Sequence, residues 1–122
     1  MTRSRLHARR RKLTQQAPDL AQLVRGSLFE RTRRCGRPTC RCADGPGHTT
    51  TYLGVTLTGG KSVQITVPDE WLPVVKTWTD NYACLAQLIE EVSAINRELL
   101  RERLLSEPEQ QPRLAPRRGK AR

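Results

Sequence analysis

The stretch that decides the fold is residues 49–67, TTTYLGVTLTGGKSVQITV. Apolar and polar side chains alternate on both sides of the Gly-Gly pair, which is typical of two half-buried strands joined by a turn. A two-residue loop would mix polar and apolar residues on each face, whereas a three-residue or five-residue loop keeps the faces matched. We therefore predict a β-hairpin with an odd-numbered loop and Gly60 in a left-handed conformation. This hairpin pairs apolar residues across the strands: Val55 with Val63, and Leu53 with Ile65.

Three further elements complete the expected fold. Residues 27–34 alternate in polarity and predict a first strand that leads into a group of cysteines. Upstream, a helix of about two turns is expected from Ala17, with Pro18 and Asp19 in its first turn and Gly26 as its stop. Downstream, apolar residues recur at helical spacing from about residue 69 to residue 105, with Asp69 as a candidate N-cap. The predicted class is α+β, with a short N-terminal helix, a three-stranded antiparallel sheet and a long C-terminal helix.

Both ends of the chain are strongly basic. Residues 1–16 and 106–122 are rich in arginine and poor in apolar side chains, so both are expected to be disordered tails around a single domain at residues 17–105. The net charge of +10 over 122 residues favours a polyanionic partner, of which nucleic acid is the commonest inside cells. The plainer alternative is that basic tails only aid solubility. No apolar run approaches the roughly 20 residues that span a bilayer, and no export signal follows the basic start, so we expect a cytoplasmic protein.

Four potential metal ligands lie between the first two expected strands. They form a C-x4-C-x-C-x5-H array, and its Gly36, Gly45 and Gly47 allow the tight turns that so short a segment needs around one ion. Three thiolates and one imidazole are a common ligand set for structural zinc, and cytoplasmic thiols stay reduced. The sequence therefore predicts a structural zinc site with these ligands: Cys35, Cys40, Cys42 and His48.

Other interpretations of the cysteines stay open. They could be free thiols, and the C-x-C spacing is tighter than in the usual zinc knuckle. Cys84 could replace His48, although its helical pattern favours a small buried residue instead. Catalytic zinc would need a general base, and Asp44 and Glu30 are better explained as turn and strand-surface residues. Since no catalytic motif occurs elsewhere, we expect neither enzymatic activity nor a small-molecule substrate.

Arginines surround the metal array. Arg31 and Arg33 alternate along the first strand and should project from one face of the sheet. A basic sheet face or zinc loop can hold phosphates, and the alternative is an ordinary solvated surface. The predicted nucleic-acid contacts are Arg31, Arg33, Arg34, Arg37 and Arg41. The three helical aromatic residues Trp71, Trp78 and Tyr82 are expected in the core, which argues against stacking on single-stranded bases.

The long helix would extend beyond what so small a domain can cover. At 1.5 Å per residue it would measure about 50 Å, so its distal half must either stand in solvent or find a partner. Its apolar residues fit a heptad with Asn96 at an a position, a feature that sets register in two-stranded coiled coils. We therefore expect a homodimer through this seam: Leu85, Ile89, Val92, Asn96 and Leu99.

The chain also resembles a known family. It contains Arg25-Gly26-Ser27-Leu28, then Cys35-Gly36-Arg37-Pro38-Thr39-Cys40-Arg41-Cys42, then Gly47-His48. These match the signature R-G-S-L, C-G-K-P-x-C-x-C and H-G-P of short bacterial and archaeal proteins with a domain of unknown function, over about residues 23–100. Here Arg replaces the usual Lys at position 37, and Thr49-Thr50 replaces the Gly-Pro after the histidine. The resemblance implies no activity.

These observations favour a non-enzymatic, zinc-stabilised protein that binds nucleic acid, with DNA as the expected partner, as an accessory or regulatory factor; the sequence by itself does not distinguish DNA from RNA. The tails would add non-specific affinity for phosphates. The alternative is a zinc-stapled adaptor that docks a protein partner through its long helix, with its charge incidental.

Overall fold

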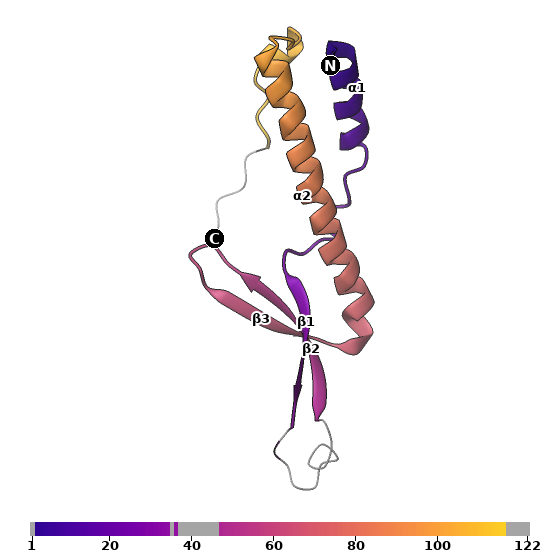
Figure 1. The fold of residues 1–122 in the computed structure, drawn as a ribbon, viewed down its shortest axis with the longest axis vertical. Coiled ribbons are helices and arrows are strands. Elements are labelled where there is room, and N and C mark those ends of the chain that lie inside the picture. Colours follow the sequence, from indigo (N-terminus) through magenta and orange to yellow (C-terminus); the bar gives the residue numbers. More distant parts are fainter. Residues whose placement is uncertain (1, 35, 37–46, 117–122) are drawn as a thin grey trace. The chain divides into compact units, whose positions relative to one another are not determined.

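The computed structural model describes residues 2–34, 36 and 47–116 (Figure 1). These residues form an α+β fold with an N-terminal helix, a three-stranded antiparallel sheet and a long C-terminal helix, as the sequence predicts. The elements follow in the order α1 (Arg3–Thr14), β1 (Ser27–Arg33), β2 (His48–Thr56), β3 (Ser62–Val67), the short 3-10 turn η2 (Asp69–Trp71), α2 (Leu72–Arg101) and a second 3-10 turn η3 (Pro108–Gln110).

The chain divides into two compact units. The first, which we call the sheet unit, is Ala17–Leu88 and contains the three strands and the first half of α2. The second, the helical unit, combines Met1–Gln16 with Ile89–Arg122 and so contains α1, the distal half of α2 and η3. None of the helices in the described parts of the chain is both long and apolar enough to cross a membrane.

The hairpin has the predicted register. In the antiparallel pair of β2 and β3, Leu53 lies opposite Ile65 and Val55 opposite Val63. The backbone N–H of Leu57 donates to the carbonyl of Lys61 at 2.7 Å, which closes a three-residue loop. Gly60 in this loop has φ +88°, as the turn requires. The odd-numbered loop and the left-handed glycine are therefore confirmed.

The sheet has one covered and one more open face. Thr51, Leu53 and Val67 are each less than a tenth exposed, and the alternation of side chains along the strands places all three on one face. The other face carries Phe29 and Tyr52, which are only half-buried. The sheet thus uses its aliphatic face for packing and leaves its aromatic face accessible.

No helix forms at residues 17–25, where the sequence predicted one. The Asp19 carboxylate instead accepts a hydrogen bond from the backbone N–H of Ala21 at 2.9 Å, which closes a local turn. The following residues bond to α2: Val24 N–H donates to the carbonyl of Trp78 at 3.1 Å, and the Trp78 indole donates to Gln22 Oε1 at 2.8 Å. A helix of two turns is only marginally stable by itself. Here residues 22–24, which we call the strap, form hydrogen bonds with α2 instead of a helix.

The N-terminal helix forms at Arg3–Thr14 instead, in the arm that we expected to be disordered. Thr2 caps it by accepting a hydrogen bond from the Arg5 backbone N–H at 3.3 Å. Leu6 and Leu13 are buried two turns apart on one face, and Ile95 and Leu99 of α2 are buried in the same unit. The high charge of the arm suggested disorder. However, arginine is a good helix former, and two leucines are enough for one apolar stripe.

The C-terminal tail is also partly structured. Residues 108–110 form η3, and Glu109 lies beside α1, where Arg10 donates a hydrogen bond to its carboxylate. Residues 108–110 therefore depart from the expectation of a disordered tail. The physical reason is the attraction between one tail carboxylate and the basic helix, a long-range pairing that a local sequence pattern does not reveal.

The start and the end of the long helix differ slightly from the expectation. Asp69 lies inside the 3-10 turn η2 and does not cap α2, and α2 ends at Arg101. Trp71 is 61% exposed, so it does not belong to the core as expected. Trp78 is half-buried through its contacts with the strap at residues 22–24.

Candidate nucleic-acid interface

An aromatic pair with an arginine lies on the more open face of the sheet. Phe29 of β1 is directly opposite Tyr52 of β2, and their rings stack with centroids 5.5 Å apart. The guanidinium carbon of Arg31 lies 5.5 Å from the Phe29 centroid and 5.6 Å from the Tyr52 centroid. A guanidinium at this distance is attracted by the ring faces, so the two rings hold the Arg31 side chain in one region of the sheet.

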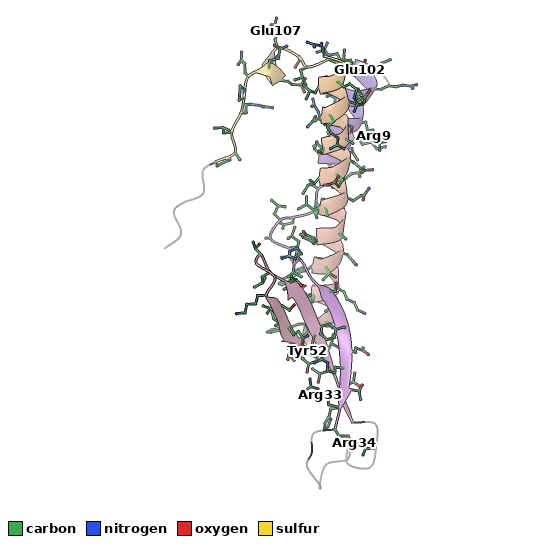
Figure 2. The ribbon with its side chains drawn as sticks, turned by 60° about the vertical axis from the view of Figure 1, so that its left-hand side comes forward. Arg9, Arg33, Arg34, Tyr52, Glu102 and Glu107 are labelled. Carbon is green, nitrogen blue, oxygen red and sulfur yellow. The ribbon has the colours of Figure 1, made fainter. Side chains whose placement is uncertain are left out.

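Further basic groups continue along the same face toward the end of the sheet. Arg33 follows Arg31 by two residues, so both belong to one face of β1, as predicted. Arg33 is the last residue of β1 and pairs with His48, the first residue of β2, and both are exposed. Figure 2 shows Arg33 and Arg34 at the end of β1, beyond Tyr52. The face therefore runs from an aromatic pair to an exposed cationic end.

A glycine closes this end of the sheet. Gly47 has φ +96°, and a Cβ at this position would lie 2.6 Å from the carbonyl carbon and oxygen of Arg33. Only glycine can combine that backbone conformation with so close an approach to the neighbouring strand. The positive φ of Gly47 agrees with the tight turn expected there, and its role is to let the chain enter β2 directly against the end of β1.

Most of the predicted zinc ligands and two of the predicted phosphate contacts belong to the segment between β1 and β2. Cys35, Cys40 and Cys42 of the predicted zinc site lie outside the described residues, and so do Arg37 and Arg41 of the predicted phosphate contacts. The fourth predicted ligand, His48, is exposed at the start of β2. Within residues 2–34, 36 and 47–116, no three or more potential metal ligands cluster. The zinc site therefore stays a prediction.

The alternative ligand Cys84 lies on α2 and is exposed. This corrects the expectation that it would be a small buried residue. The heptad pattern placed it beside apolar residues, but its side chain falls on the solvent side of the helix. Its exposure does not by itself indicate a function.

The residues of the predicted dimer seam differ in their surroundings. Leu99 is fully buried within its own chain, and the Asn96 side chain accepts a hydrogen bond from Arg10 of α1 at 2.7 Å. Ile89 is 57% exposed, whereas Leu85 and Val92 are half-buried. At Asn96, α1 therefore supplies a side-chain contact, and Leu99 is already covered without a second chain. Figure 1 shows α1 beside the distal half of α2 and running in the opposite direction.

Sequence reasoning did not anticipate the pairing of Phe29 with Tyr52. The sequence does not reveal this pairing, because a long connection joins β1 to β2. No turn rule fixes the register of two strands across such a connection. The alternation of Phe29 and Arg31 along β1 did indicate that they share a face. Only the register Phe29 to Tyr52 brings the second ring under the same guanidinium.

Comparison with known proteins identifies the family of the chain. The model of a family described as a domain of unknown function, DUF6788, matches residues 3–77. The match includes α1, the whole sheet and the first turns of α2, so it begins and ends earlier than the resemblance noted in the sequence. No curated protein and no solved structure matches the chain. Since the matched region covers more than half of the 122 residues, this protein belongs to the DUF6788 family.

Proposed function

We propose that this protein is a non-enzymatic, cytoplasmic nucleic-acid-binding protein that grips DNA with the open face of its sheet. The observation that carries the proposal is the line of cationic side chains on this face, with Arg31 held over Phe29 and Tyr52 and Arg33 exposed at the strand end. An arginine that is already oriented loses less conformational entropy on binding a phosphate than a free one. The net charge of +10 supports the same partner.

Zinc belongs to this proposal as a structural element. The three cysteines follow β1 in the sequence and His48 begins β2, so a zinc ion bound by all four would hold the segment carrying Arg37 and Arg41 next to the paired strand ends. In such a site the metal supplies rigidity and no chemistry. The two further arginines would then extend the basic line that Arg31 and Arg33 begin.

The test is the salt dependence of DNA affinity. Fluorescence anisotropy of a labelled duplex at several salt concentrations should give a linear decrease of log affinity with log salt. The double variant Arg33→Ala and Arg34→Ala should flatten that slope by about 0.9 for each phosphate that the variant no longer neutralises. The control is Lys76→Ala with Arg97→Ala, which removes the same charge from exposed positions on α2. An equal change in slope for both double variants would contradict the proposal.

A protein-interaction adaptor is the second candidate. It is favoured by large apolar side chains that stay exposed along the C-terminal helical segment, namely Trp71, Val74 and Ile89. Exposed apolar groups of this size are typical of surfaces that bind another protein. An adaptor would bind DNA weakly and without saturation, and Ile89→Ser would abolish its partner binding and leave DNA affinity unchanged. The proposed homodimer through α2 is a special case, since Ile89 would then face a second copy.

A further inference from the structure

The helical unit contains a basic groove that is separate from the sheet face. The groove has a volume of about 850 Å³ and is lined by side chains from α1, from η3 and from the tail. Within α1, Arg3, His7 and Arg10 follow one another at helical spacing and so share a face. We define the basic groove by its cationic or potentially cationic residues: Arg3, His7, Arg10, Arg11 and Arg113.

A single carboxylate organises the groove. Glu109 Oε1 accepts a hydrogen bond from the Arg10 guanidinium, and Oε2 accepts from the Ser106 backbone N–H and hydroxyl, each at 2.9 Å. The Ser106 backbone N–H and then Arg10 lower the pKa of Glu109 from 4.5 to about 2. The carboxylate is therefore ionised at neutral pH, and its charge is balanced by Arg10. These bonds dock η3 against α1 and so bring Arg113 to the groove.

The remaining guanidinium groups of the groove lack such a partner. In the part of the chain that the structure describes, Arg3, Arg11 and Arg113 form no ion pair. Three positive charges in one concavity are therefore not balanced by a neighbouring carboxylate.

His7 lines the groove beside Arg10. Because the Arg10 guanidinium, 2.9 Å from His7 Nδ1, can only donate, Nδ1 accepts and the hydrogen of the neutral ring lies on Nε2. This buried Nε2 has no hydrogen-bond partner among the described residues, since the Glu109 carboxylate is 3.6 Å away.

We propose that the basic groove binds a small oligophosphate, such as inorganic pyrophosphate or the phosphate end of a nucleotide. Guanidinium groups bind phosphoryl oxygens with two parallel hydrogen bonds, and three of them without an ion pair line this one concavity. The volume of the groove lies in the range of small-molecule sites. A nucleic-acid backbone spreads its charge along a strand, whereas a pyrophosphate concentrates several negative charges within the extent of this open groove. This site is in a different unit from the sheet face and does not depend on the DNA proposal.

The test is isothermal titration of the full chain with inorganic pyrophosphate in magnesium-free buffer. We expect saturable binding that Arg3→Gln with Arg11→Gln weakens at least tenfold. The control is Arg5→Gln with Lys12→Gln, which removes the same charge from exposed positions of α1 that do not line the groove, and it should change affinity less than twofold. Equal weakening in both variants, or no saturable binding by the wild type, would overturn the proposal.

A second variant distinguishes an organised binding site from non-specific electrostatic attraction. Glu109→Gln removes a negative charge, so simple electrostatics predicts tighter pyrophosphate binding. If Glu109 instead holds the groove together, the same variant weakens pyrophosphate binding, and this is the expected result. Tighter binding would overturn the proposal.

The source of the phosphate and the independence of the two sites can be tested with the same protein. A short DNA duplex should not displace pyrophosphate, and displacement by duplex at lower concentration than pyrophosphate itself would overturn the small-ligand assignment. Arg33→Ala with Arg34→Ala should leave pyrophosphate affinity unchanged. If the protein binds DNA but not pyrophosphate, this result would refute the proposal for the basic groove and leave the DNA proposal intact.

Discussion

Arg33, the last residue of β1, lies directly opposite His48, the first residue of β2. The pairing joins the two kinds of residue that the sequence singled out, a predicted phosphate contact and a predicted metal ligand. Both are exposed at the end of the sheet from which the cysteine-containing segment continues. A metal bound there would be adjacent to the arginines of the open face, and this adjacency connects the predicted zinc site with the proposed DNA contact.

Replacing Gly47 should destabilise this end of the sheet. In Gly47→Ala the new Cβ would meet the Arg33 backbone at 2.6 Å, in addition to the strain of φ +96°. We expect a loss of at least about 2 kcal/mol in the free energy of unfolding, measured by urea denaturation. Gly59→Ala is the matched control, because Gly59 has φ +95° but no atom within 4 Å of a Cβ, so only strain of about 1 kcal/mol is expected. Equal losses for both variants would show that Gly47 does not pack against Arg33.

Zinc should be present and should stabilise the fold. Protein prepared under reducing conditions without chelators should contain about one zinc per chain, and a strong chelator should lower its melting temperature. Cys40→Ser should abolish the bound zinc, because it removes one of four ligands. Cys84→Ser should leave the zinc content unchanged, since Cys84 is exposed on α2 and is not one of the predicted ligands. Metal-free protein with an unchanged melting temperature under chelation would contradict the prediction.

Leu99 tests whether α1 or a second copy covers the distal part of α2. Leu99 is fully buried, so Leu99→Ala should lower the free energy of unfolding by about 2–5 kcal/mol. If α1 covers Leu99, the loss is independent of protein concentration. Leu100→Ala is the control, because Leu100 is 66% exposed and should cost less than about 0.5 kcal/mol. A loss at Leu99 that grows as protein concentration rises would indicate a dimer seam instead.

The docking of η3 on α1 should depend on pH through Glu109. The hydrogen bonds from Ser106 and Arg10 lower its pKa to about 2, below the ordinary value of 4.5. Because the folded form has the lower pKa, the contribution of Glu109 to stability is complete above about pH 4.5 and disappears as the pH falls toward about 2. The NMR signal of the Ser106 amide should follow this transition.

The matched variants for this pH dependence are Glu109→Gln and Glu107→Gln. Glu109→Gln should remove the transition at Ser106, whereas Glu107→Gln should retain it, since Glu107 is exposed. A Ser106 signal that titrates in the same way in Glu109→Gln would assign the pH dependence to another group.

How much of this structure the sequence revealed depended on whether the information was local. The hairpin could be predicted in detail, because only an odd-numbered loop puts Leu53, Val55, Val63 and Ile65 on one face. The long helix was predicted for the same reason, since its apolar spacing persists over many turns. Local patterns were enough for these elements.

The errors came from contacts between distant segments. Residues 17–25 contain a helical start signal, but the bonds from Gln22 and Val24 to α2 outweigh the preference of two helical turns. The basic arm became α1 because Leu6 and Leu13 find a buried surface in the helical unit. The aromatic pair of the open face could likewise not be predicted from the sequence. The pair forms only in the observed register of β1 against β2, and these strands are joined by a long connection.

The most direct measurement for the central claim is an NMR titration of the full chain with a short DNA duplex. We predict that the ring signals of Phe29 and Tyr52 and the side-chain N–H signals of Arg31 shift, because all three lie on the proposed contact face. The methyl signals of Ile65 should stay in place, although Ile65 is 52% exposed, because it lies on the opposite face of the sheet. Shifts confined to residues 2–16 and 102–116, with the Tyr52 and Arg31 signals unchanged, would contradict DNA binding by the sheet.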